Sequence, residues 1–152
     1  MFYNHSIKHS TKLVKVKFKN CVIDQKVAHA IRQAEELLRK DSTMIKELLG
    51  KKDWKFDSVD VVYKLLMDKE PVSVFTYKSW NPFTKAVGYF DGKAIFLNVK
   101  FLEKFDFSQV CGTLLHEYAH YCGFTHGNNF KTEEKCLYSV PYYLSENVSK
   151  WI

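Results

Sequence analysis

The stretch Leu115–His126, which reads LHEYAHYCGFTH, decides what kind of fold this chain is expected to adopt. Residues four positions apart on a helix lie on one face, so we expect His116 and His120 to project side by side. A neutral imidazole is a good ligand for Zn²⁺, and this spacing lets two rings share one ion. Apolar residues such as Val110 and Leu114 precede the motif. They predict a buried helix, in which histidines need polar partners.

Three further residues complete the predicted site. Gly123 can adopt a positive φ and end the helix, which lets His126 return as a third ligand. Glu117 lies beside the first ligand and is expected to reach a metal-bound water without binding the metal itself. Three protein ligands leave one tetrahedral position for water, as in catalytic zinc sites. The sequence therefore predicts one catalytic Zn²⁺ ion held by His116, His120 and His126.

The same stretch resembles the metzincin family of zinc metallopeptidases. Its motif, H-E-x-x-H-x-x-G-x-x-H, is matched at every fixed position over residues 116–126. Several metzincins also carry a turn beneath the zinc that reads Ser-x-Met-x-Tyr. Here Ser139 and Tyr143 are in place, but Pro141 stands where the methionine would be. The resemblance is to a divergent, minimal metzincin, and it implies a zincin-like fold and cleavage of peptide bonds.

A second stretch is similar to another family. Residues His126–Phe130 read HGNNF, like the H-G-x-x-F element that follows H-E-x-x-H in SprT-like proteases, which act on proteins crosslinked to DNA. The Gly123 offset and the Ser-x-x-x-Tyr pattern favour the metzincin interpretation, while the basic charge of the chain leaves the SprT-like one open. A third hypothesis is a non-catalytic binding protein that keeps zinc for stability.

The predicted reaction is hydrolysis of a peptide bond in a protein or peptide substrate. Zinc lowers the pKa of bound water to about 7, which supplies hydroxide near neutral pH. Glu117 is expected to take the proton and to deliver it to the leaving amine. The metzincin resemblance implies that the phenol of Tyr143 stabilises the oxyanion. The alternative for Tyr143 is a packed ring with a satisfied hydroxyl, as for most tyrosines in such a segment.

Length and composition set the outer bounds. A chain of 152 residues predicts one domain over 1–152 with a single core. A hydrophobic content of 46% with 16% aromatic residues excludes a disordered chain. No apolar run approaches the roughly 20 residues that span a membrane, and the first residues lack the apolar stretch of a secretion signal. We therefore expect a monomer without a membrane partner that is cytoplasmic, exported by a non-standard route, or already trimmed.

The net charge of +6 is unevenly distributed along the chain. Residues 1–100 carry 19 basic and 11 acidic side chains, whereas residues 101–152 carry four and six. A basic surface attracts nucleic acid, but a solvated lysine-rich face is the more common outcome. Nucleic acid is thus a possible partner that the sequence does not favour.

The spacing of apolar residues predicts the order of elements. Val27 and Ile31 belong to a helical pattern, and Asp91-Gly92 is a strong hairpin signal between two strands. We expect a strand over 12–19, helices over 24–40, 42–49 and 57–68, strands over 71–78, 84–90 and 93–100, a zinc-binding helix over 107–122 capped by Ser108, and a mostly irregular tail. This order predicts an α+β domain whose small mixed, twisted sheet packs on a scaffold helix and the zinc-binding helix.

The metzincin resemblance also gives the strand over 84–90 a place in the fold. It implies an edge strand beside the cleft, where an extended peptide could add to the sheet through main-chain hydrogen bonds. The alternative is that this strand is only one half of a structural hairpin.

Overall fold

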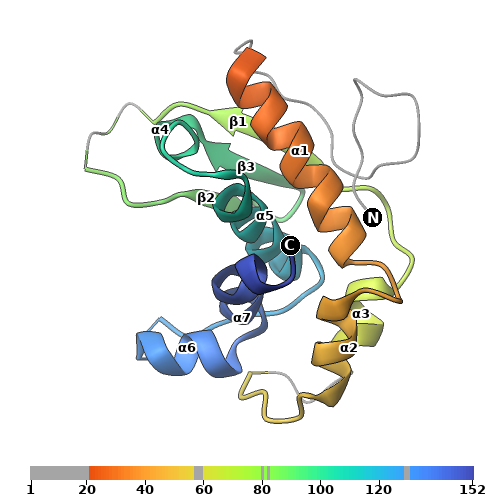
Figure 1. Ribbon diagram of the computed structural model, residues 1–152. Coiled ribbons are helices and arrows are strands. Elements are labelled where there is room, and N and C mark those ends of the chain that lie inside the picture. The colour runs from red at the N-terminus through yellow and green to blue at the C-terminus, as the bar shows by residue number, and fades with distance from the viewer. Residues whose placement is uncertain (1–20, 57–59, 80, 82, 129–130) are drawn as a thin grey trace.

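The computed structural model describes residues 21–56, 60–79, 81, 83–128 and 131–152. Within these ranges the chain forms an α+β domain with one three-stranded mixed sheet (Figure 1). The elements are α1 (Cys21–Leu37), α2 (Thr43–Gly50), α3 (Val61–Leu66), β1 (Ser73–Tyr77), β2 (Gly88–Phe90), β3 (Ala94–Asn98), α4 (Val99–Leu102), α5 (Phe107–Tyr121), α6 (Thr132–Tyr138), α7 (Val140–Asn147) and a 3₁₀ turn, η1 (Val148–Lys150). The predicted strand over 12–19 lies outside the described residues.

Helix α1 confirms the predicted scaffold helix, although it begins and ends three residues earlier than expected. Its buried face repeats every three or four residues, at Val27, Ala30, Ile31 and Ala34. This face packs against α5. Asp24 lies inside the first turn of α1, where a negative charge interacts favourably with the unpaired amides of the helix start.

The two short helices after α1 confirm the predicted helix type, and side chains determine where each one begins. Ser42 caps α2 by accepting a hydrogen bond from the amide of Ile45 at 3.1 Å. Asp60 caps α3 by accepting one from the amide of Tyr63 at 3.0 Å. Such caps satisfy amides that have no partner within the helix. Helix α3 is shorter than the predicted 57–68, and residues 57–59 lie outside the described part of the chain.

The sheet has the strand order β1-β3-β2. Strand β3 pairs parallel with β1 and antiparallel with β2, so the predicted hairpin is confirmed. Its turn depends on Gly92 at a φ of 94° and on the Asp91 carboxylate, which accepts hydrogen bonds from the amides of Lys93 and Ala94. The predicted strand 93–100 is too long, because the Asn98 side chain accepts from the amide of residue 100 and starts α4.

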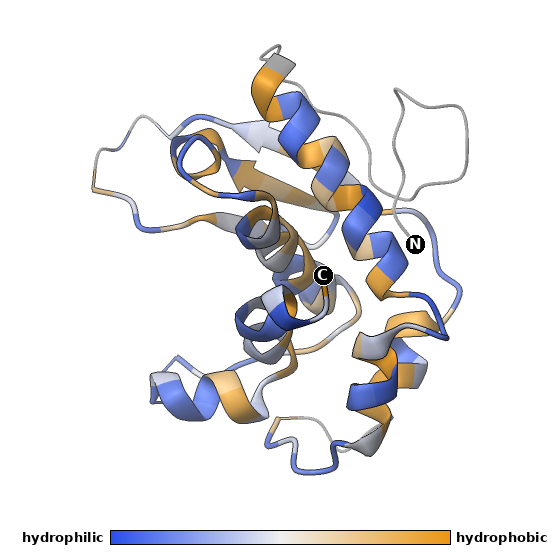
Figure 2. Ribbon diagram, in the orientation of Figure 1, coloured by the Kyte–Doolittle hydropathy of each residue, from blue (hydrophilic) through white to orange (hydrophobic). Residues whose placement is uncertain are grey.

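The two faces of the sheet differ in what covers them. Ile95 and Leu97 of β3 are buried, and α5 packs against β2 and β3 (Figure 2 shows the apolar character of β3). Alternate residues point to the opposite face. There Phe96 stacks between Phe75 of β1 and Tyr89 of β2, at centroid distances of 5.3 and 4.8 Å. Such cross-strand aromatic contacts stabilise a small sheet.

Helix α5 lies at the centre of the domain, between the sheet and α7 (Figure 1). Its cap is Asp106 rather than the expected Ser108. The Asp106 carboxylate accepts from the amide of Gln109 at 2.9 Å, and the Gln109 side chain accepts from the amide of Asp106 at 3.0 Å. This reciprocal capping box satisfies two helix-start amides and explains why the helix begins at Phe107.

The expectation of an irregular tail is wrong, since α6, α7 and η1 follow the histidine motif. Pro141 occupies the first turn of α7, where its fixed φ favours a helix start and its missing amide costs nothing. Gly112 of α5 allows α7 to approach closely, because a Cβ there would lie 2.9 Å from the carbonyl oxygen of Ser145. Long-range packing on α5 therefore orders the tail.

None of the described helices combines the length and the apolar character needed to cross a lipid bilayer.

Candidate metal centre

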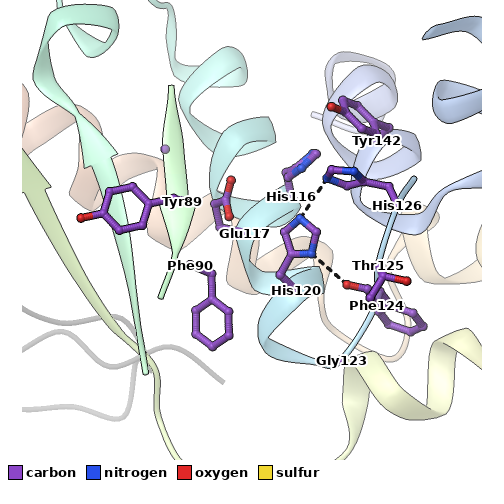
Figure 3. Close-up of a pocket in the computed structure, with 11 residues that line it drawn as sticks. Tyr89, Phe90, His116, Glu117, His120, Gly123, Phe124, Thr125, His126 and Tyr142 are labelled. Carbon is purple, nitrogen blue, oxygen red and sulfur yellow. Dashed lines mark hydrogen bonds between the residues drawn. The ribbon is translucent and has the colours of Figure 1, made fainter. Parts of the chain in front are cut away.

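The structure brings the three predicted histidine ligands together. His116 and His120 project from α5, and His126 comes from the segment that follows it (Figure 3). One ring nitrogen from each histidine lies within 4.8 Å of the other two. The closest pair is Nε2 of His120 and Nε2 of His126, at 3.2 Å. Three imidazole nitrogens at these separations are compatible with one bound metal ion.

The reversal that returns His126 to the site is local to the end of α5. Gly123 adopts a φ of 95°, and its amide donates to the carbonyl of His120 at 2.9 Å. The amide of Phe124 donates to the carbonyl of Ala119 at 3.0 Å. These two bonds form a Schellman motif, which a glycine at positive φ stabilises. The ring of Phe124 is almost fully buried and anchors the returning segment.

The three rings differ in how their second nitrogen is held. Nδ1 of His120 lies 2.8 Å from the carbonyl oxygen of Phe124. Because a carbonyl only accepts, Nδ1 carries the proton and the Nε2 lone pair faces the cluster. Nδ1 of His116 lies 3.5 Å from Oγ of Ser145, a long contact. Nδ1 of His126 is buried and has no hydrogen-bond partner among the described residues.

Burial favours the uncharged forms of the His116 and His126 rings. Burial, together with the neighbouring His120 and His126 rings, lowers the pKa of His116 to about 3. Burial and the neighbouring His120 also lower the pKa of His126. A neutral imidazole has a lone pair to offer a cation, whereas a protonated one has none. The donor set therefore fits a divalent transition metal, for which imidazole is a preferred ligand.

Glu117 lies where the sequence places it, beside the histidines and facing β2 (Figure 3). Its side chain is buried, and burial raises the pKa of its carboxyl to about 7. A carboxyl with this pKa exchanges a proton near neutral pH, which is the property of a general base.

Two cavities meet at these residues. The first has a volume of about 590 Å³, and all three histidines, Glu117 and strand β2 line it. The second, of about 440 Å³, extends toward the start of α5. They share four lining residues: Gly88, His116, Glu117 and Tyr142. The edge position expected for the strand over 84–90 is confirmed for β2, which is shorter than expected and forms one wall of the first cavity.

The structure places Tyr142, rather than Tyr143, at the histidines. The Tyr142 ring lies 4.7 Å from the His116 ring and 4.6 Å from the His126 ring, measured between centroids. Tyr143 lines neither cavity and packs against Trp54 and Trp151, at 5.3 and 6.2 Å.

Helix geometry explains this difference, because consecutive helical residues point about 100° apart. Sequence reasoning missed Tyr142 because it assigned no helix to this segment. The proline at position 141 is the signal that could have revealed the helix start.

No protein-family model, curated protein sequence or solved structure matches this chain.

Proposed function

We propose that this chain is a zinc-dependent metallopeptidase of zincin-like, divergent metzincin type that acts on proteins or peptides. One observation carries the proposal: three imidazoles converge beside the buried carboxyl of Glu117, at the wall of a cavity. The matched motif over residues 116–126 supports the same assignment.

His116, His120 and His126 would hold the ion. A zinc ion bound by three protein ligands supplies a Lewis acid and brings the pKa of a water molecule to about 7. The hydrogen bond from His120 Nδ1 to the carbonyl of Phe124 fixes the orientation of that ring. Such outer contacts typically contribute about 10- to 100-fold to metal affinity.

Glu117 would act as the general base and then as the general acid. Its carboxylate accepts a proton from the attacking water and later donates it to the leaving amine. A pKa raised to about 7 by burial suits both roles. Its buried position beside His116 also removes competing bulk water, which strengthens electrostatic interactions in the site.

Tyr142 would supply a hydrogen bond to the oxyanion that develops on the scissile carbonyl. Burial raises the pKa of its phenol, so the hydroxyl stays protonated near neutral pH. This side chain lines both cavities, as Glu117 does. A preorganised donor at that position stabilises the transition state more than the ground state.

Strand β2 would hold the substrate in an extended form. It is an edge strand, and Gly88, Tyr89 and Phe90 line the first cavity. An edge strand has unpaired main-chain groups, to which a peptide can add by β-augmentation.

The test combines metal analysis with cleavage of a peptide library. The purified protein should contain one equivalent of zinc and should cleave peptides. Glu117→Gln should keep the zinc and lose about 100- to 10,000-fold in turnover, the usual contribution of a general base. Protein without a stoichiometric transition metal, or a Glu117→Gln variant as active as wild type, would contradict the proposal. Zinc without any cleavage would favour the non-catalytic binding protein.

Action on DNA-linked proteins is a second candidate because residues 1–100 are strongly basic. Five of those lysines belong to residues 1–20, which lie outside the described part of the chain together with Asn129 and Phe130 of the SprT-like element. Binding to single-stranded DNA that weakens steeply as salt rises would favour this candidate, and no binding at about 50 mM salt would exclude it.

A further inference from the structure

We propose that the second cavity is a pocket for one substrate side chain, and that Lys85 and Glu146 set its charge preference in favour of uncharged residues. The proposal rests on the proposed function and deepens it. Lys85 lies before β2 and Glu146 lies on α7, and both line this cavity. Figure 3 shows that β2 and Tyr142 of α7 stand on the two sides of His116 and Glu117.

Helix α5 forms the floor of this cavity. Gln109, Thr113 and Glu117 line it and are spaced four residues apart, so they share one face of the helix. This face also carries His116. A side chain that extends from Glu117 toward the start of α5 therefore meets Thr113 first and Gln109 next.

The cavity is continuous with the histidine site. Both cavities share Gly88, His116, Glu117 and Tyr142, so a peptide that crosses from one to the other passes between the proposed base and the proposed oxyanion donor. The residue that enters the second cavity is then next to the bond that is cleaved. This placement makes the cavity a determinant of where the peptide is cut.

Close packing of β2 on α5 defines the edge of the pocket. A Cβ at Gly88 would lie 2.8 Å from the carbonyl oxygen of Phe96 and 3.4 Å from Cγ2 of Thr113. A side chain at Gly88 would clash with the Phe96 carbonyl of β3, whereas its contact with Thr113 would be an ordinary one, so β2 lies within van der Waals reach of the helix floor. The peptide main chain can run along β2 while one side chain points toward Thr113.

The charges of the pocket come from its two sides. Lys85 and Glu146 are exposed, and among the described residues neither forms an ion pair with the other. A charged substrate side chain of either sign would be attracted by one of these two residues and repelled by the other. It would also lose hydration beside Phe105 and Val87, which costs free energy without a dedicated partner.

An uncharged polar side chain avoids both penalties. Thr113 and Ser145 line the same cavity and offer hydroxyl groups for hydrogen bonds. We therefore expect residues such as glutamine, asparagine, serine or threonine beside the scissile bond in preferred substrates.

The test removes one charge at a time and reads the cleavage preference with a peptide library randomised around the scissile bond. Lys85→Gln leaves Glu146 alone and should shift the preference toward lysine and arginine by about 2- to 5-fold. Glu146→Gln leaves Lys85 alone and should shift it toward aspartate and glutamate by a similar factor. The expected shifts in preference are small because exposed charges interact weakly through solvent.

Two matched controls change the same charges elsewhere. Lys93→Gln removes an exposed lysine at the turn between β2 and β3, and Glu133→Gln removes an exposed carboxylate on α6. Neither residue lines the second cavity. Both controls should leave the preference unchanged, whereas equal shifts in controls and pocket variants would show a general charge effect and overturn the proposal.

A second readout separates failure of the pocket from failure of the proposed function. Peptide binding to Glu117→Gln, measured by calorimetry without turnover, should follow the same order of preference. Cleavage by wild type with no shift in Lys85→Gln or Glu146→Gln overturns the pocket and leaves the peptidase intact. No cleavage by wild type and no peptide binding to Glu117→Gln overturns both.

Discussion

On one side of the histidine cluster the chain reverses directly after α5, whereas on the other side the cluster is covered by a helix from the C-terminal tail. We call Gly123–His126 the turn side and Tyr142–Ser145 the tail side. On the turn side, His120 Nδ1 is 2.8 Å from a carbonyl oxygen. On the tail side, His116 Nδ1 is 3.5 Å from Ser145 Oγ. The shorter contact is therefore the one on the turn side, between residues that lie close together in sequence.

The two sides of the histidine cluster have different tasks. The turn side supplies and orients proposed metal ligands, since it carries His126 and holds the ring of His120. The tail side supplies no metal ligand among the described residues but places Tyr142 at the cavity. We therefore expect changes on the turn side to alter metal affinity and changes on the tail side to alter catalysis with the metal retained.

Among changes to the two sides, the largest effect is expected at the contact that positions the tail side. Gly112→Val would place side-chain atoms against the Ser145 carbonyl and Val148 and push α7 away from α5. We expect a loss of about 2 kcal/mol in the free energy of unfolding, typical of overpacking, and lower cleavage with the metal still bound. Denaturant unfolding and metal analysis measure the two effects.

Gly50 offers the control for this change, because a Cβ there meets no atom within 4 Å. Gly50→Ala should leave both stability and cleavage near wild type. Loss of metal from Gly112→Val would show that the two sides are not separate.

The next largest effect concerns the two neighbouring tyrosines. Tyr142→Phe removes the proposed oxyanion donor and should lower turnover by about 10- to 30-fold. This loss is smaller than the roughly 100- to 1,000-fold seen when an oxyanion-hole donor is removed from a well-studied protease. Tyr143→Phe should change turnover by less than about 2-fold, because that ring packs against Trp54 and Trp151. Steady-state kinetics on one good peptide decides between them. A larger loss in Tyr143→Phe would return the role to the residue that the metzincin resemblance implies.

A smaller effect is expected from the backbone of the turn side. Gly123→Ala forces a side chain into a positive φ, which costs about 1–2 kcal/mol. Because the strain acts on the segment that carries His126, metal affinity should fall as well, as a competition titration with a chelator would show.

Gly92→Ala is the matched control, since Gly92 has almost the same φ in an exposed hairpin turn. It should lower stability by a similar amount without changing metal affinity. Equal loss of metal affinity in both variants would mean that the turn side has no special role.

The smallest effect is a pH dependence of the contact that ties the tail to α2. The Glu47 carboxylate accepts hydrogen bonds from Lys150 Nζ at 2.6 Å and from Trp151 Nε1 at 2.7 Å. Burial alone would raise the pKa of Glu47, but these hydrogen bonds and the Lys150 charge outweigh it and leave the pKa lowered.

The sign of the effect follows from that lowered pKa. The stabilisation is present above pH 4.5, the ordinary pKa, and is lost as the pH falls through the lower folded value. Glu47→Gln should therefore cost about 0.5 kcal/mol near pH 7 and less at pH 3. Unfolding curves at both pH values test this, and an equal cost at the two would refute it.

The parts of the fold that the sequence predicts are those that depend on residues close together in the chain. His116, His120 and Gly123 lie within one turn or two of each other, so helix geometry and a single positive φ bring the ligands together. Asp91-Gly92 specifies the hairpin in the same way. Local geometry leaves few alternatives at such positions.

The parts that it does not predict depend on distant contacts. Helix α7 needs the space that Gly112 leaves on α5, and no pattern around Pro141 reveals that partner. At the start of α5, Asp106 and Ser108 are both suitable caps, and the reciprocal bond with Gln109 decides between them. At the end of β3, the Asn98 side chain turns the chain into α4, although the apolar pattern continues.

Strand β2 has only three residues, Gly88–Phe90. This short length limits how many main-chain hydrogen bonds a bound peptide could form with it. At about 3.4 Å per residue, it offers a template of roughly 10 Å, enough to align only a few backbone units. A segment this short would make few main-chain hydrogen bonds to a bound peptide. Under the proposed function, the substrate side chains near the scissile bond would therefore have to determine which peptides bind. Because β2 is so short, its edge also offers little surface on which a second copy of the chain could pair to extend the sheet.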